Sequence, residues 1–328
     1  MNRQTARPFL LLLAVIAALT CACNRDGSGP DLPEGAVLVA IAGGEQVVAL
    51  DPTGERVLAR LEVGREPHML DMTPDRRTAL AAVTQTDRVA LLDLSGFRVR
   101  ARVPVGDRPH QVSLTPDGRT AIVTNEGESF LTLIDVPDAA VRGRIEVDGE
   151  PFHVRIAPNG GTAWVSYNGR DYMTVIDLAQ RRRLRDIPLG RTPLHVSFDA
   201  AGNAWVADSE ANAVLRVPAD ASTPDATFPT GRYPIEVTFT PDKREAWVPN
   251  AVSNEVRVLD AATGRELARI PTGRNPLHLA FSADGRLAFL TERDDGTVAT
   301  IDVVARAVLR RVAVGPNPDG VLTGPRAP

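Results

Sequence analysis

One stretch of the chain decides the fold: residues 105–125 read VGDRPHQVSLTPDGRTAIVTN. A Gly-x-x-Pro loop leads into a short apolar strand, the turn sequence Thr-Pro-Asp-Gly follows, and a second strand completes the stretch. Two further runs rich in Val, Ile and Leu come next, at residues 130–135 and 141–147. Since no part of this unit has sustained helical periodicity, it predicts four short strands joined by polar turns.

The unit recurs with a period near 42 residues. Its proline occurs at spacings of 42, 42, 42, 41, 42 and 42, at Pro67, Pro109, Pro151, Pro193, Pro234, Pro276 and Pro318. The Asp that closes the third run keeps the same period, at Asp51, Asp93, Asp135, Asp177, Asp260 and Asp302, with Pro218 in the remaining slot. Both markers share the short interval, so we expect one residue to be missing at the turn of residues 200–203. Four strands with this period are typical of a β-propeller blade.

The two ends of the chain set the number of blades. Residues 36–62 supply three strands but lack the first strand of a unit, which reappears only at the C-terminus as Pro318-Asp319-Gly320-Val321-Leu322. Six complete units and this split unit make seven blades. We therefore predict an all-β, seven-bladed propeller over residues 35–323, followed by a tail of residues 324–328. Pairing of the C-terminal strand with the three N-terminal strands closes the ring and removes exposed sheet edges.

One slot in the second strand is always large and apolar. Its occupants in the complete blades are Leu80, Ile122, Trp164, Trp205, Trp247 and Phe289. Since every complete blade fills the slot, we interpret the three tryptophans as core packing between blades and not as a surface on which a cofactor stacks.

The units resemble the YVTN-type propeller repeat, which is named for its second strand. That strand appears here as Ile-Val-Thr-Asn at residues 122–125 and as Trp-Val-Pro-Asn at residues 247–250, with the Gly-x-x-Pro, Thr-Pro-Asp-Gly and Ile-Asp elements around it. The resemblance covers about residues 35–323. It implies the propeller fold and leaves the function open, because surface-layer proteins, lactonase-like propellers and propeller domains of haem or copper enzymes all share it.

Composition excludes several classes of protein. With 43% hydrophobic and 24% charged residues the chain has ample material for a core. Its two cysteines, Cys21 and Cys23, lie near the N-terminus, so neither a disulfide nor a cysteine metal cluster holds the body together. The net charge of −4 excludes nucleic acid as a partner. The sequence contains no nucleophile elbow, phosphate loop, dinucleotide fingerprint or Cys-x-x-Cys-His motif.

The N-terminal segment has the layout of an export signal. Residues 1–22 have a basic start, an apolar run over residues 9–19 and small residues before a cysteine. This resembles a bacterial lipoprotein signal peptide and implies lipidation of Cys23, with Cys21 as the alternative; an ordinary secretory signal stays open. Residues 23–34 follow as a polar tether. We expect an exported, monomeric lipoprotein of the periplasm or cell surface, anchored to a membrane.

All five histidines lie one or two residues after the repeat proline. Together with the two acids that fill the slot in the other blades, the set is His68, His110, His153, His195, Glu236, His278 and Asp319. This position opens the innermost strand beside the central channel, so the imidazoles can converge. Neutral histidines with a carboxylate suit Cu, Zn, Ni or Fe. Two readings oppose a metal site: the histidines bond neighbouring blades, and the one-residue offset of His68 and His110 turns them to the opposite strand face.

The Gly-x-x-Pro loops add a second ring of candidate residues. It consists of Arg65, Arg108, Arg191, Arg232 and Arg274, with Tyr167, Tyr172 and Tyr233 in loops on the same face. Arginine binds carboxylates and phosphates bidentately, so a small anionic ligand, or the propionates of a haem-like cofactor, would fit here. The alternative is that the arginines pair with acids of adjacent loops, such as Glu66, Glu126, Glu210 and Asp294.

These observations favour a binding or accessory protein whose site is the channel mouth. The ligand there would be a transition metal, a haem-like cofactor, a small anion or a protein partner. A metal-assisted hydrolase of the lactonase kind, using residues such as His195 and Glu236, is one alternative. A protein-interaction scaffold is the other.

Overall fold

Each repeat forms a blade because its apolar runs are joined by turns that bond their own backbone. In the turn after the first strand of the third blade, Thr115 Oγ1 donates to Asp117 Oδ1 at 2.6 Å, and the backbone N–H of Arg119 donates to the same oxygen at 3.0 Å. Gly118 takes a φ of 68°, which glycine adopts without steric cost. The turn therefore reverses the chain and starts the second strand.

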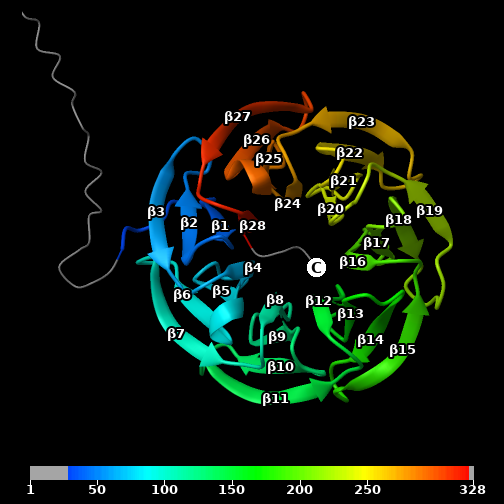
Figure 1. Cartoon of the computed structure of the whole chain (residues 1–328), viewed down its shortest axis with the longest axis horizontal. Helices are drawn as coiled ribbons and strands as arrows, with labels where there is room; N and C mark the ends of the chain where they lie inside the picture. The colour runs from blue at the N-terminus through cyan, green and yellow to red at the C-terminus, as the bar shows by residue number, and fades with distance from the viewer. Residues whose placement is uncertain (1–28, 325–328) are drawn as a thin grey trace, which may run out of the picture.

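The computed structural model describes residues 29–324, which form seven four-stranded antiparallel sheets arranged around a central channel (Figure 1). The innermost strands are β4 (Pro67–Met72), β8 (Pro109–Leu114), β12 (Pro151–Ile156), β16 (Pro193–Phe198), β20 (Thr238–Phe239), β24 (Pro276–Phe281) and β28 (Pro318–Leu322). The second strands are β1 (Val37–Ile41), β5 (Thr78–Val83), β9 (Thr120–Asn125), β13 (Thr162–Tyr167), β17 (Ala204–Asp208), β21 (Glu245–Asn250) and β25 (Leu287–Glu292). The third strands are β2 (Gln46–Leu50), β6 (Arg88–Asp93), β10 (Phe130–Asp135), β14 (Tyr172–Asp177), β18 (Ala213–Val217), β22 (Glu255–Asp260) and β26 (Thr297–Asp302). The outermost strands are β3 (Val57–Glu62), β7 (Arg98–Pro104), β11 (Ala140–Glu146), β15 (Arg182–Pro188), β19 (Ala226–Pro229), β23 (Glu266–Pro271) and β27 (Ala307–Ala313). Two short 3₁₀ turns follow second strands, at Thr84–Thr86 and Arg293–Asp295.

The ring closes as the sequence predicts. Strand β28 pairs antiparallel with β1, with Val321 opposite Val39 and Leu322 opposite Leu38. Figure 1 shows the red C-terminal strand beside the blue N-terminal blade. The first blade therefore combines the two ends of the chain, and the seven-bladed count is confirmed.

The missing residue lies in the fifth blade, at the predicted turn. Phe198 pairs with Ala204, whereas the equivalent pair in the third blade is Leu114 with Ala121, so the turn between β16 and β17 is one residue shorter. The side chain of Asp199 bridges this short turn, because its Oδ1 accepts from the backbone N–H of Ala201 and of Asn203, both at 2.9 Å.

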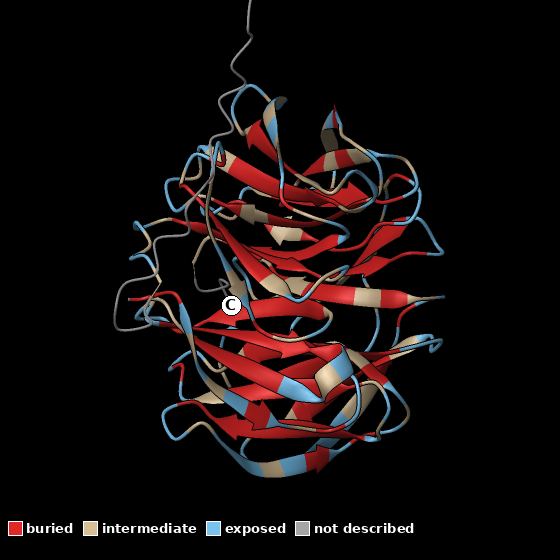
Figure 2. Cartoon of the chain, turned by 60° about the vertical axis from the view of Figure 1, so that its left-hand side comes forward, coloured by how far each residue is buried: buried red, intermediate tan, exposed pale blue. Residues whose placement is uncertain are grey.

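The core lies between the blades, as the tryptophan slot predicts. Trp205 and Trp247 have no exposed surface, and the ring of Trp205 meets Phe239 of the next blade edge to face at 5.5 Å. Figure 2 shows strands that are buried almost throughout, with exposure confined to loops and outer strands. Replacement of such a side chain by alanine typically costs about 3–5 kcal/mol of stability, so this slot holds adjacent blades in register.

The last six residues of the predicted tether run along the first two blades. The N–H of Gly29 donates to the carbonyl of Gly96 at 2.7 Å, and Leu32 packs on the core shared by the first two blades. Residues 1–28, with the predicted signal peptide and both cysteines, lie outside the described residues, as do residues 325–328. Among residues 29–324 we find no helix that is long and apolar enough to cross a membrane.

Candidate functional site: a histidine and carboxylate ring inside the channel

A β-bulge directly after the repeat proline aims side chains into the channel. In β8, Pro109 pairs with Asn125 and Val112 with Val123, so three steps along β8 match two along β9. Strands β4, β12, β16, β24 and β28 have the same irregularity. Because a bulge re-aims the side chains beside it, a residue one or two positions after the proline reaches the same place. The offset of His68 and His110 therefore does not turn them away.

The predicted residues form one closed ring inside the channel. Their exposure ranges from 3% for Glu236 to 9% for His68. The imidazole ring of each histidine lies close to the next one, with centroid distances of 4.7 Å (His68 to His110), 5.0 Å (His110 to His153), 3.7 Å (His153 to His195) and 5.1 Å (His195 to His278). We call these residues the histidine ring: His68, His110, His153, His195, Glu236, His278 and Asp319.

Asp319 lies between His278 and His68, the last and first histidines of the ring, and Glu236 contacts His278 from the other side. His278 lies between two of them, with Nδ1 3.1 Å from Glu236 Oε2 and Nε2 3.2 Å from Asp319 Oδ1. The other oxygen of Asp319 bonds Nδ1 of His68. Nε2 of His68 in turn lies 3.4 Å from Glu66 Oε1, so a continuous series of ionisable groups runs from Glu236 to Glu66.

The carboxylate half of the ring favours charge. Burial opposes protonation of His278, but the Glu236 and Asp319 carboxylates outweigh it and raise the pKa of His278 to about 9. Burial also opposes protonation of His68, and the hydrogen bond and charge of Asp319 nevertheless raise its pKa. Burial alone would raise the pKa of Asp319, yet its bonds to His278 and His68 hold that pKa well below the usual range. At neutral pH His278 is therefore an imidazolium that faces the carboxylate of Asp319.

His110 and His153, in the opposite half of the ring, stay neutral. Burial, together with the charge of His68, lowers the pKa of His110 to about 3, and burial lowers the pKa of His153 well below its ordinary value. Nδ1 of His110 and Nδ1 of His153 are buried and form no hydrogen bond. A neutral imidazole with an unused ring nitrogen is a metal ligand that needs no deprotonation. Phe152 stacks on His110 at 4.2 Å and fixes its ring plane.

The ring brings together two sets of potential metal ligands. His68, His110 and Asp319 form one set, and His195, Glu236 and His278 form the other. Within each set the ligand atoms lie within 4.8 Å of one another, and all six residues are buried. The mixture of imidazole nitrogens and carboxylate oxygens is the donor chemistry of zinc, copper, nickel and iron sites.

The ring separates two cavities of the channel. The wide cavity, of about 1030 Å³, lies at the start of the innermost strands and is lined by His68, His110, His153, His278 and Asp319 together with loop residues such as Thr84 and Asn254. This is the predicted face, made by loops that enter the blades and loops between second and third strands. His195 and Glu236 instead line a narrow pocket of about 240 Å³ at the other end of those strands. The histidine ring therefore lies buried inside the channel, between these two cavities, and not at the exposed channel mouth.

The arginines do not form one basic ring around the wide cavity. Of the five predicted arginines, only Arg108 and Arg274 line it, and both meet acids: Arg108 Nη1 lies 3.7 Å from Glu126 Oε2, and Arg274 Nε donates to Asp295 Oδ1 at 2.7 Å. Arg191 and Arg232 line a separate shallow pocket that also contains Glu210. Arg65 is exposed and lines none of the cavities described here. Pairing with acids of neighbouring loops thus accounts for Arg108 and Arg274.

The tyrosines are distributed in the same uneven way. Tyr233 lines the wide cavity, as the sequence predicts. The placement of Tyr167 in a loop is wrong, because Tyr167 ends strand β13 and is 1% exposed in the core between two blades. Tyr172 begins strand β14 and packs against Tyr167 at 5.5 Å. The sequence suggests Glu66 and Glu126 as ion-pair partners of the loop arginines. In the structure both also lie beside histidines of the ring, Glu66 beside His68 and Glu126 beside His110. The position of Glu66 directly before the repeat proline could have indicated this contact.

Solved structures share this architecture. Hydrazine synthase of Kuenenia stuttgartiensis matches with 20% identity over 78% of this chain and 89% of that chain, at a TM-score of 0.69. The dihydro-heme d1 dehydrogenase NirN in complex with DHE matches with 18% identity over 89% of this chain and 77% of that chain, at a TM-score of 0.69. A functionally unknown protein of Desulfotomaculum acetoxidans matches with 14% identity over 87% and 98%, at a TM-score of 0.78. No protein-family model and no curated protein matches the chain. Since identities this low show the fold alone, the chain is similar to these proteins as a seven-bladed β-propeller.

Proposed function

We propose that this propeller is an exported accessory protein that binds a transition metal ion in its histidine ring. One observation carries the proposal: two buried sets of three ligands, each drawn from different blades, have donor atoms within 4.8 Å of one another. Buried polar groups are normally satisfied by hydrogen bonds, so the unpartnered Nδ1 atoms of His110 and His153 need an explanation. A metal ion would satisfy such atoms.

Charge also fits a cation. Glu236 and Asp319 are buried to 3% and 4% exposure, and carboxylates at such depth require a positive partner. In the metal-free protein His278 supplies that charge as an imidazolium. A divalent ion would take over this role, and His278 would then lose its proton and become a ligand.

Export and anchoring belong to the same proposal and rest on the sequence of residues 1–23. A lipid on Cys23 would hold the propeller at a membrane surface on the polar tether. Metal delivery or storage outside the cytoplasm suits such a protein, since the sequence contains none of the common nucleophile or nucleotide motifs.

Metal content tests the proposal directly. We would strip the protein with EDTA, remove the chelator, titrate Zn²⁺, Cu²⁺ and Co²⁺ separately, and measure bound metal and melting temperature. We expect one or two equivalents for at least one metal and a rise in melting temperature, since binding to the folded state alone stabilises it. The His110→Gln/His195→Gln variant, which removes one imidazole from each set, should lose this binding, whereas Asp138→Asn, which removes an acid that is 72% exposed, should keep it. A folded protein that takes up none of the three metals would contradict the proposal.

A haem-like cofactor in the wide cavity is a second candidate. The cavity of about 1030 Å³ is at the upper end of the range for ligand sites, and its floor is made of imidazoles. A similar propeller, NirN, is described in complex with DHE. Addition of haem to the purified protein should then shift its visible absorption spectrum, and His110→Gln should alter that spectrum. An unchanged free-haem spectrum in the presence of folded protein would exclude this candidate.

A further inference from the structure

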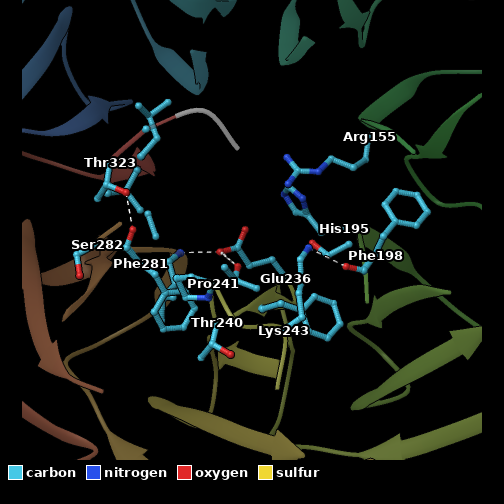
Figure 3. A pocket seen from close by; sticks show the side chains of 18 of the residues that line it. Arg155, His195, Phe198, Glu236, Thr240, Pro241, Lys243, Phe281, Ser282 and Thr323 are labelled. Carbon is cyan, nitrogen blue, oxygen red and sulfur yellow. Dashed lines mark hydrogen bonds between the residues drawn. The ribbon is translucent and has the colours of Figure 1, made fainter. Parts of the chain in front are cut away.

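The narrow pocket at the far end of the channel is positively charged, although the protein is acidic. Three long cations line it: Arg76, Arg155 and Lys243. The single carboxylate among its lining residues is Glu236, which accepts from His278, from the backbone N–H of Leu279 and from Thr238 Oγ1. Figure 3 shows Arg155, His195 and Glu236 pointing towards the open centre of this pocket, with Lys243 between Thr240 and Phe198.

Two of these cations occupy a strained backbone position. Lys243 and Arg76 have φ values of 59° and 58° in the turn after the innermost strand. The equivalent residue in the four other complete blades is glycine, at Gly118, Gly160, Gly202 and Gly285. For a residue with a Cβ, this left-handed conformation costs about 1–2 kcal/mol of conformational free energy. The two blades that accept this strain are those whose turn residue reaches the narrow pocket.

The neighbouring blade directs Lys243 inwards. The shortened turn of the preceding blade has Ala200 at the position that holds proline in four other blades and Ala283 in the last blade. The ammonium of Lys243 crosses to that blade and donates to the carbonyl of Phe198 at 3.1 Å. The only lysine of the sequence is therefore held at the pocket wall.

Arg155 supplies the second inward charge. It is the fourth residue after Pro151, a register position that holds Asp71, Ser113, Ser197, Thr238, Ala280 and Leu322 in the other blades. Burial and the nearby charge of Arg155 both lower the pKa of Lys243. An anion bound in the pocket would be attracted by both cations.

Three phenylalanines form an apolar part of the wall of this small pocket. Phe198, Phe239 and Phe281 are the fifth residues after the prolines of three consecutive blades, and all three line the pocket. Its volume is about 240 Å³, whereas a cavity of about 150 Å³ already accepts benzene. The space therefore fits one ring or a short acyl chain with an acidic group.

A buried amide gives independent evidence for a ligand. Gln111 lines the pocket and is 2% exposed, and its Oε1 atom forms no hydrogen bond, while its Nε2 donates to the carbonyl of Val112 at 2.9 Å. An unsatisfied buried acceptor costs about 1–3 kcal/mol. A polar ligand or its bound water would satisfy it.

We propose that the narrow pocket binds a small organic carboxylate, with its acidic group at Lys243 and Arg155 and its apolar body against Phe198, Phe239 and Phe281. The pocket lies on the opposite side of the histidine ring from the wide cavity. His195 and Glu236 of the histidine ring also line this pocket, but Lys243 and Arg155 belong to neither set of potential metal ligands, so binding of the carboxylate does not require a bound metal.

Calorimetric titration of the metal-free protein in EDTA and low salt tests this site. The probes are acetate, hexanoate, benzoate and phenylacetate, with phenylacetamide as the uncharged match for phenylacetate. We expect hexanoate, benzoate or phenylacetate to bind more tightly than acetate. Phenylacetamide should bind about tenfold more weakly than phenylacetate, because charge-assisted hydrogen bonds are about twice as strong as neutral ones.

Variants locate the binding. Lys243→Met and Arg155→Met keep the side-chain stems and should each weaken phenylacetate binding at least about fivefold. Lys243→Arg should retain binding, and Arg244→Met, which removes an adjacent charge that is 86% exposed, should leave it unchanged. Absence of binding by all four carboxylates to the folded protein would overturn the proposal. Equal affinity for phenylacetate and phenylacetamide would also overturn it, and this comparison needs no variant.

Discussion

Oδ1 of Asp319 lies 3.2 Å from Nε2 of His278, and Oδ2 of Asp319 bonds the imidazole of His68. Asp319 belongs to β28, the strand that closes the ring of blades. The closing strand therefore places one carboxylate between histidines of the two neighbouring blades. Closure of the fold and assembly of the histidine ring depend on the same residue.

We predict that Asp319→Asn strongly destabilises the protein. The amide keeps the shape of the side chain but removes the charge that His278 and His68 face, and loss of one partner of a buried ion pair costs about 3–5 kcal/mol. Urea unfolding at pH 7 in EDTA measures the free energy of unfolding. Asp138→Asn, at an exposed position, should change it by less than about 0.5 kcal/mol. A loss below about 1 kcal/mol in Asp319→Asn would show that the buried charges are not coupled.

The pH dependence of stability should have a maximum near pH 6.5, the ordinary pKa of histidine. The pKa of His278 is raised to about 9, so its stabilisation is complete below pH 6.5 and is lost as the pH rises through about 9. The loss is on the order of 3 kcal/mol. Unfolding free energies measured from pH 6 to 10 in EDTA should therefore decline, and His278→Gln should flatten this decline.

Below pH 6.5 the free energy of unfolding should depend on His110, which is neutral in the folded protein. The pKa of His110 is lowered to about 3, so between pH 6.5 and pH 3 the unfolded chain takes up a proton that the folded chain excludes. Stability therefore falls as the pH falls through this window. His110→Phe, which keeps a ring against Phe152, should reduce the slope below pH 6.5. An unchanged acid slope in that variant would mean that His110 is protonated in the fold.

The repeat explains why the propeller architecture could be predicted from the sequence. Blade boundaries, strand number and ring closure all follow from the positions of the repeat prolines and of Pro318. Even the shortened turn, predicted at residues 200–203 from one interval of 41 residues, lies between Phe198 and Ala204 in the structure. Periodic sequences report fold well because each unit must satisfy the same contacts with its neighbours.

The site could be predicted only in part. The convergence of the histidines follows from their shared register, but the bulge that brings His68 and His153 to one level depends on strand pairing, which the sequence does not express. The arginine loops have no such constraint: Arg108 and Arg274 turn to local acids. The narrow pocket escaped sequence reasoning because Arg155 and Lys243 come from different blades and meet only in the folded ring.

Metal binding, where it occurs, should release protons. His278 is an imidazolium in the metal-free protein, and a metal that uses Glu236 or His278 has to displace that proton. We expect release of about one proton per metal at pH 7 and an affinity that rises with pH towards pH 9. Calorimetry in two buffers of different ionisation enthalpy counts the protons. Metal binding without proton release would place the ion away from the carboxylate half of the ring.

The lipid anchor makes a prediction about a single cysteine. In a bacterial host, Cys23→Ala should move the protein from the membrane fraction to the soluble exported fraction and abolish labelling by a radioactive fatty acid, whereas Cys21→Ala should leave both unchanged. The reverse pattern would identify Cys21 as the lipidated residue. Secretion of both variants in the same unlabelled form as the parent chain would show an ordinary signal peptide.

Removal of the closing strand should open the ring. A chain that ends at Val314 lacks β28, whose Val321 and Leu322 are 1% exposed and whose backbone pairs with β1. The loss leaves an unpaired edge on β1 and exposes apolar side chains at the junction of the first and last blades. We expect aggregation on gel filtration and a broadened urea transition, whereas a chain that ends at Gly324 should behave as the parent. If the chain that ends at Val314 is monomeric and unfolds with unchanged cooperativity, six complete blades and a three-stranded seventh are enough for a stable fold. Pairing of β28 with β1 would then not be needed to keep the ring closed.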